Sequence, residues 1–232
     1  MKLPPLSSRL LACCNLVNPG ASVADIGCDH GYLGIWLLMQ NIANSVIAAD
    51  VNQGPLDSAF RNSHKYGVSE RMRFYLSDGV QNIPRDFDTM VCAGMGADTM
   101  ISILDAAPWL KSDQYRLILQ CQSRRPELRK YLYANGFTIL SETLAQDGKF
   151  IYPIIEVTYR PGETLTEDGY YITPALLESN CPLLPAFYDR VVKGLKTTVA
   201  GLSKTGGEKY DYYYYVLQEL LKMEEKVHGN RS

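Results

Sequence analysis

Short apolar segments alternate with amphipathic segments over the first part of the chain. The apolar runs have the length of buried strands, and the segments between them repeat apolar residues every three or four positions, as helices do. A capped helix is predicted near residues 7–17. The predicted strands are 22–26, 46–50, 72–76, 89–93 and 116–120, and the predicted helices between and after them are 32–41, 54–66, 97–106 and 126–136. This alternation predicts an α/β fold with a doubly wound, mostly parallel sheet.

The pattern changes after residue 136. Segments 137–144 and 150–159 are both strand-like, and the turn residues Gln146-Asp147-Gly148-Lys149 separate them. We therefore expect an antiparallel hairpin at the end of the sheet. A parallel sheet that ends in such a hairpin is typical of S-adenosylmethionine-dependent methyltransferases, whereas nicotinamide-binding sheets usually continue with parallel strands.

The last part of the chain has a helical pattern without strands. Two long helices are predicted, 183–203 and 208–227, around the break Lys204-Thr205-Gly206-Gly207. Their apolar spacing favours a coiled-coil-like helical hairpin, so we divide the chain into domains 1–160 and 161–232. Four consecutive tyrosines, 212–215, cannot all lie on one helix face. Those that are not buried against the hairpin could contact a partner or could simply be exposed to solvent.

Composition narrows the function classes. Lys plus Arg number 23 and Asp plus Glu 25, so any nucleic-acid contact must depend on a local patch. Six cysteines without C-x-x-C spacing predict neither a disulfide framework nor a metal site. No apolar run approaches the roughly 20 residues of a membrane span. We expect a cytoplasmic monomer without membrane contact.

The stretch ADIGCDHGYLG, residues 24–34, follows the first predicted strand and resembles a nucleotide-binding loop. A dinucleotide site needs G-x-G-x-x-G beside the phosphates, but here Asp29 stands where the middle glycine would be, between Gly27 and Gly31. S-adenosylmethionine carries no phosphate and offers an ammonium and a sulfonium cation. Carboxylates suit that ligand, and the glycines allow the backbone to approach it closely.

Acidic residues also follow the next two strands. Asp50 ends the second strand and is placed to accept both ribose hydroxyls, while Asp78 follows the third and could accept from the adenine amino group. A turn-capping role is the alternative for either residue alone. The predicted cofactor-binding residues are Asp25, Gly27, Cys28, Asp29, His30, Gly31, Asp50, Val51, Asp78, Gly79 and Ala93.

The acceptor side is predicted after the fourth strand, at Gly94-Met95-Gly96, where glycines leave room for a flat base; a plain βα turn is the alternative. Asp29 could orient the acceptor or serve only as a cofactor ligand, and His30 could contact a ligand or stabilise the loop. The predicted catalytic residues are Asp29, Gly94, Met95 and Gly96.

Several of these strings resemble one known family, the bacterial tRNA (adenine(22)-N1)-methyltransferases. They are Asp25-Ile-Gly-Cys-Asp-His-Gly-Tyr-Leu33, Ala93-Gly-Met-Gly96, Leu117-Ile-Leu-Gln120, Leu128-Arg129…Gly136-Phe137 and Asp147-Gly-Lys-Phe150. The chain departs from the family at Ala97, usually glycine, and at Cys121-Gln122, usually Pro-Asn.

The resemblance implies a class I, Rossmann-like methyltransferase that uses S-adenosylmethionine to methylate adenine N1 in tRNA. RNA contacts are expected at Arg9, Arg124, Arg125 and Arg129, with a solvated helix face as the alternative for Arg129 and Lys130. Two alternatives stay open: a methyltransferase for another RNA base or a small molecule, and an RNA-binding protein that transfers no methyl group.

Overall fold

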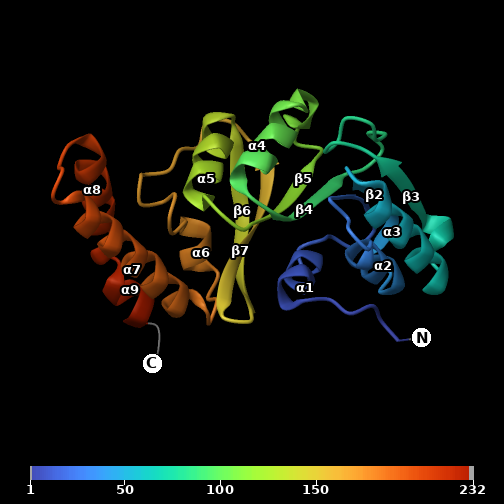
Figure 1. Cartoon of the computed structure of the whole chain (residues 1–232), viewed down its shortest axis with the longest axis horizontal. Coiled ribbons are helices and arrows are strands. Elements are labelled where there is room, and N and C mark those ends of the chain that lie inside the picture. Colours follow the sequence, from blue (N-terminus) through green and yellow to red (C-terminus); the bar gives the residue numbers. More distant parts are fainter. Residues whose placement is uncertain (1, 230–232) are drawn as a thin grey trace. The chain divides into compact units, whose positions relative to one another are not determined.

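The computed structural model describes residues 2–229. The chain forms two compact units, one ending at Glu163 and the other beginning at Thr164 (Figure 1). No helix in the described part is both long and apolar enough to cross a membrane.

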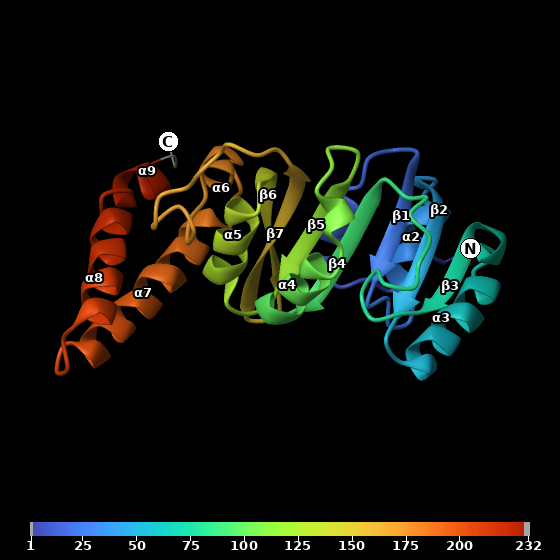
Figure 2. The ribbon, with the colours of Figure 1, turned by 90° about the horizontal axis from the view of Figure 1, so that it is seen from above.

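The first unit is built on one seven-stranded sheet with the order β3-β2-β1-β4-β5-β7-β6 (Figure 2). Strands β1 to β5 are parallel, and β7 runs antiparallel to both β5 and β6. The predicted Rossmann-like sheet with a terminal antiparallel hairpin is therefore confirmed. The strands are β1 Ala21–Ile26, β2 Ala43–Asp50, β3 Met72–Leu76, β4 Thr89–Met95, β5 Arg116–Cys121, β6 Phe137–Asp147 and β7 Phe150–Tyr159.

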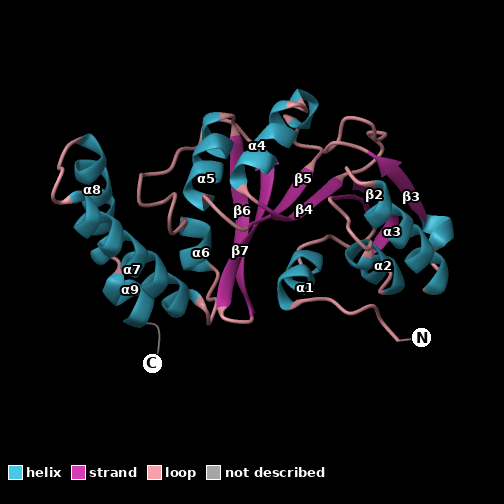
Figure 3. Cartoon of the chain, in the orientation of Figure 1, coloured by secondary structure: helices cyan, strands magenta, loops and turns pink. Residues whose placement is uncertain are grey.

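Helices cover both faces of this sheet (Figure 3). Helices α2 and α3 lie on one face and α4 and α5 on the other, while α1 lies near the end of the hairpin. The central strands are apolar on both faces because both faces are covered. The helices are α1 Ser8–Cys14, α2 Tyr32–Met39, α3 Gln53–Lys65, α4 Ala97–Asp105 and α5 Arg125–Ala134, with the short 3₁₀ turns η1 Ser69–Arg71 and η2 Pro108–Leu110.

Two strands are longer than predicted in ways that shape the site. Strand β4 continues to Met95, with an irregularity in its pairing to β5 between Ala93 and Met95. Strand β6 continues to Asp147, which leaves only Gly148 and Lys149 for the hairpin turn.

The second unit consists of helices α6 Pro174–Glu178, α7 Leu184–Leu202, α8 Glu208–Leu221 and α9 Glu224–His228. The prediction of one continuous helix over 208–227 is wrong, because the helix is interrupted after Leu221. The Leu220 carbonyl accepts from the buried Tyr188 hydroxyl at 2.7 Å and from the Met223 N–H at 2.9 Å, and this pairing ends α8. Of the four consecutive tyrosines, Tyr214 and Tyr215 are exposed.

Candidate functional site

A cavity of about 350 Å³ lies at the carboxyl ends of β1 and β4, beside α1. Open α/β sheets bind ligands at this edge. The cavity brings together the glycine-rich loop, the end of β4 and one face of the N-terminal helix. Its lining residues are Arg9, Leu10, Asp25, Gly27, Cys28, Asp29, His30, Tyr32, Leu33, Ala93, Gly94 and Met95.

The loop between β1 and α2 depends on left-handed backbone conformations. Gly27, Asp29 and Gly31 have φ angles of 71°, 51° and 70°. A Cβ at Gly27 would meet Met95 Cε, and one at Gly31 would lie 2.8 Å from Ala59 Cβ. Both positions favour glycine by backbone conformation, and Gly31 is also required by the close approach of Ala59. Asp29 adopts the same conformation with a side chain that is 72% exposed, at the cavity.

Asp25 supplies a buried carboxylate to the cavity. The residue is 5% exposed, and its Oδ2 has no hydrogen-bond partner among the described residues. The pKa of the carboxyl is raised to about 7, mainly by burial. A hydrogen bond from the Gly34 N–H lowers the pKa in part, and the nearby charges of Asp50 and Asp29 raise it. A buried carboxylate oxygen with an unused lone pair is a site for a cationic or hydrogen-bond-donating ligand.

Asp50 lies behind the loop. Its Oδ2 accepts from the Asp29 N–H at 3.2 Å and its Oδ1 from the Asn52 N–H at 2.9 Å. The carboxylate thus holds the left-handed Asp29 in place, while its lone pairs are not exhausted by two bonds. Val51, the next residue, is 63% exposed.

Not every predicted cofactor residue lines the cavity. Asp25, Gly27, Cys28, Asp29, His30 and Ala93 do, whereas Gly31, Asp50, Val51, Asp78 and Gly79 lie outside its wall. Asp78 is exposed at the end of β3, the strand next to β2. Gly79 packs against Ile103, where a Cβ would come within 2.8 Å of Cγ1.

The predicted acceptor side is held together by one amide. Gln120 Oε1 accepts from the Gly94 N–H at 3.0 Å and from Arg9 Nη1 at 2.9 Å, and the side chain is fully buried. Gly94 has a φ of 85°, and a Cβ there would lie 3.3 Å from Arg9 Nη1. Gly94 and Met95 line the cavity, but Gly96 precedes α4 and packs against Ser123 instead.

The thiols around the cavity are neutral. Burial raises the pKa of Cys92 to about 12, and it raises the pKa of Cys28 beyond the ordinary range of a thiol, with Asp25 adding to both effects. Because the thiolate is the nucleophilic form, neither cysteine is placed for covalent catalysis.

One predicted RNA contact is wrong. Arg129 is 2% exposed and forms an ion pair with Glu142, whose side chain is also buried. If this guanidinium moved to bind a phosphate, the Glu142 carboxylate would be left buried without its partner Arg129, which is strongly unfavourable. Arg125 is partly buried, and its pKa is lowered by burial and by Arg129. Arg124 is exposed and pairs with Asp98 at 2.7 Å.

Sequence reasoning missed several residues at this site. Leu10, Tyr32 and Leu33 line the cavity, and Gln120 links Arg9 to Gly94 without lining it. Tyr32 and Leu33 belong to the quoted loop motif, which was the available signal. No pattern along the chain indicates that Gln120 and Arg9, 111 residues apart, share a hydrogen bond.

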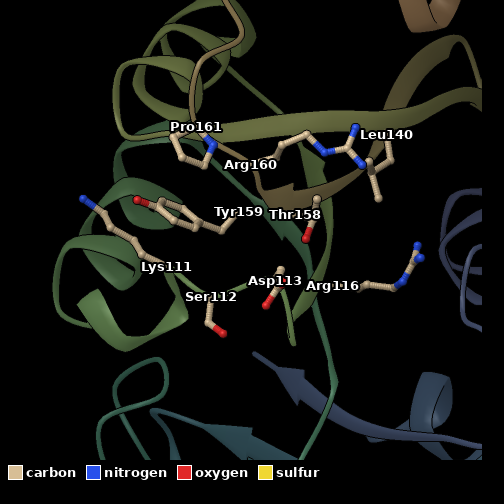
Figure 4. Close-up of a pocket in the computed structure, with 9 residues that line it drawn as sticks. All are labelled: Lys111, Ser112, Asp113, Arg116, Leu140, Thr158, Tyr159, Arg160 and Pro161. Carbon is tan, nitrogen blue, oxygen red and sulfur yellow. The ribbon is translucent and has the colours of Figure 1, made fainter.

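A larger cavity of about 640 Å³ lies at the opposite edge of the sheet, near the first residue of β5 and the end of β7 (Figure 4). Its arginines already have anionic neighbours, since Arg116 pairs with Glu156 and Arg160 lies 3.8 Å from Glu163. It lacks a buried carboxylate like Asp25 and lies away from the glycine-rich loop. The smaller cavity is therefore the candidate functional site.

Comparison with known proteins gives independent evidence about the family of this chain. The family described as "Methyltransferase domain" matches residues 6–155. A putative tRNA methyltransferase of Mycoplasma genitalium is 34% identical over 180 residues, which are 74% of this chain and 79% of that protein. The tRNA (adenine(22)-N(1))-methyltransferase of Bacillus subtilis is 33% identical over 146 residues, 62% of this chain and 61% of that protein.

A solved structure is similar over nearly the whole chain. It is a putative tRNA (m1A22) methyltransferase of Streptococcus pneumoniae in complex with S-adenosyl-L-methionine. The TM-score is 0.82 at 25% identity, and the match covers 95% of this chain and 100% of that one.

Proposed function

The chain belongs to the methyltransferase family, in the group of the bacterial tRNA (adenine(22)-N1)-methyltransferases, and from this we propose that it methylates adenine N1 in tRNA with S-adenosylmethionine. The observation that carries the proposal is Asp25, which lines a cavity bordered by a glycine-rich loop and whose buried Oδ2 has no hydrogen-bond partner among the described residues. A buried carboxylate oxygen, which only accepts hydrogen bonds when ionised, suits a cationic ligand and disfavours a phosphate.

The residues of this cavity and of the sheet edge beside it fit S-adenosylmethionine. Asp25, in the cavity wall, would accept from its ammonium group. Asp50 and Asp78, outside the wall at the ends of the next two strands, would accept from the ribose hydroxyls and from the adenine amino group, and Gly27 would allow the cofactor to approach the loop closely. The bound cofactor supplies an electrophilic methyl group on a positively charged sulfur. Val51, exposed beside Asp50, would provide apolar contact for its adenine ring.

Methyl transfer to adenine N1 needs no catalytic base. Neutral adenine N1 has a free lone pair, so no side chain needs to remove a proton before the transfer. The task of Gly94 and Met95 is to hold a flat base against the end of β4, in a position where water is excluded. Asp29, whose carboxylate reaches the cavity, is placed to accept from the exocyclic amino group or to bind the cofactor.

We further propose that residues 1–160 form the cofactor-binding and catalytic domain and that residues 161–232 form a coiled-coil-like domain that contacts the body of the tRNA. Arg124 and Arg125, beyond the end of β5, would contact phosphates near the catalytic site. The protein would act as a monomer in the cytoplasm.

The test is a transfer assay. The full chain is incubated with methyl-labelled S-adenosylmethionine and unmodified total tRNA, and the methylated nucleotide is mapped by mass spectrometry. We expect 1-methyladenosine at position 22. Label on another RNA base would replace the proposed acceptor, and cofactor binding without transfer to any RNA would indicate a small-molecule methyltransferase or a protein that only binds RNA.

A further inference from the structure

The end of the β6–β7 hairpin carries an exposed aromatic ring. Phe150 is 53% exposed and pairs across the strands with Asp147, on either side of the two-residue turn Gly148-Lys149. Strand β7 runs antiparallel to β5, with Ile155 opposite Leu119 near the carboxyl end of β5. Phe150, five residues earlier in β7, therefore extends beyond the sheet edge at which the cavity opens.

Contacts connect this ring to the cavity. Residues directly opposite each other in an antiparallel pair project from the same face, so Phe150 and Asp147 are neighbours on one face of the hairpin. Asp147 Oδ2 lies 3.8 Å from Arg9 Nε, and Arg9 lines the cavity. The ring of Tyr152, two residues along on the same face, has its centroid 6.1 Å from that of Phe150.

One cationic side chain lies against the ring and a second lies beside its cross-strand neighbour. Lys149 Nζ lies 5.4 Å from the centre of the Phe150 ring, and Arg9 on α1 lies 3.8 Å from Asp147, the residue opposite Phe150. An exposed aromatic face beside cationic side chains is the combination that proteins use to bind unpaired nucleobases, because the ring stacks on the base and the cations attract the phosphates. The hairpin leaves this ring more than half exposed, so the ring is accessible to a base.

We propose that Phe150 is a stacking platform for a nucleobase next to the target adenine, with Lys149 contacting the adjoining phosphate. An enzyme that acts on a base inside a folded RNA must displace that base from its stack, which leaves a neighbouring base without a partner. Phe150 takes the place of the lost stacking partner. The inference rests on the proposed function, since it assumes an RNA acceptor at the cavity beside Arg9.

The first experiment compares two exposed phenylalanines in the full-length protein. Phe150→Ala should lower kcat/KM for tRNA roughly five- to a hundredfold, the effect of losing one stacked base. Its S-adenosylmethionine affinity, measured by calorimetry, and its melting temperature should be unchanged. The matched control is Phe60→Ala on α3, which removes a ring that is 50% exposed and should leave kcat/KM for tRNA within twofold.

The second experiment detects stacking directly. Phe150→Trp should retain activity, and the tryptophan it introduces should lose fluorescence when tRNA is added, beyond any change shown by the wild-type protein. Lys149→Ala should weaken tRNA binding and reduce the slope of log K against log salt by about one phosphate contact, whereas Phe150→Ala should leave that slope unchanged.

These outcomes separate the two proposals. If the wild-type protein methylates no tRNA but tRNA still quenches the Phe150→Trp protein, the proposed function fails, and Phe150 stacks on an RNA base without a target adenine beside it. If the wild-type protein methylates tRNA while Phe150→Ala matches it in kcat/KM and the Phe150→Trp protein shows no quenching, the platform is overturned.

Discussion

Asp50 holds Asp29 in a left-handed conformation through a hydrogen bond from the Asp29 N–H to Asp50 Oδ2 at 3.2 Å. The carboxylate predicted to bind the ribose therefore also shapes the loop that carries a second cavity residue. The two roles act in the same direction, because losing the carboxylate would remove a cofactor contact and release Asp29 from its strained conformation.

Replacing Asp50 should accordingly weaken cofactor binding. Asp50→Ala is expected to reduce S-adenosylmethionine affinity by about 1–3 kcal/mol, the cost of losing a charged hydrogen-bonding partner. Calorimetric titration measures the change. Asp57→Ala, which removes an exposed carboxylate from α3, is the control and should bind as the wild type does. An Asp50→Ala protein with wild-type affinity would argue against the ribose assignment.

Asp25 should make the folded protein less stable as the pH rises. Its pKa is raised by burial to about 7 from 3.8, so between these values the folded state binds more protons than the unfolded state, and stability falls as the pH increases through this range. Asp25→Asn cannot ionise. The free energy of unfolding is measured by urea denaturation at pH 5 and at pH 8. Between these two pH values it should fall by about a few kcal/mol more in the wild-type protein than in Asp25→Asn. Equal losses in the two proteins would contradict a buried Asp25 carboxyl with a raised pKa.

The same group should couple cofactor binding to proton release. A cation beside Asp25 favours the ionised carboxylate, so binding below pH 7 must expel a proton from it. Affinity for S-adenosylmethionine should therefore rise with pH up to about 7, by at most about tenfold per unit. Calorimetry in two buffers of different ionisation enthalpy measures the released proton. The release should be absent in Asp25→Asn, and its persistence there would assign it to another group.

The sequence predicted the sheet, the terminal hairpin and the loop because those features are local: each strand is an apolar run, and each predicted acid directly follows one. It failed where a side chain's surroundings come from distant segments. Arg129 lies between Leu128 and Leu132 on α5, and only the fold shows that the buried Glu142 of β6 receives it. The break after α8 likewise depends on Tyr188, a residue of another helix.

Removing the second unit tests whether the first unit binds the cofactor alone and whether the second contributes to tRNA binding. A chain ending at Glu163 keeps the whole sheet and every residue of the 350 Å³ cavity. It should bind S-adenosylmethionine with near wild-type affinity and bind tRNA more weakly, as measured by calorimetry and by filter binding. Circular dichroism checks that the shortened chain is folded. Undiminished tRNA affinity would reject the role proposed for residues 161–232.

Filling the space at Gly94 should impair transfer more than cofactor binding. In Gly94→Ala the new Cβ would lie 3.3 Å from Arg9 Nη1, on the side of the cavity proposed for the acceptor base, and the backbone would hold alanine at a φ of 85°. Gly67→Ala is the matched control: its φ is 70°, so it carries a similar backbone cost of about 1–2 kcal/mol, but its Cβ would meet nothing within 4 Å. Both proteins should lose similar thermal stability, whereas only Gly94→Ala should lose methyl transfer to tRNA while retaining cofactor affinity. Equal transfer rates in the two variants would show that the acceptor does not lie against Gly94.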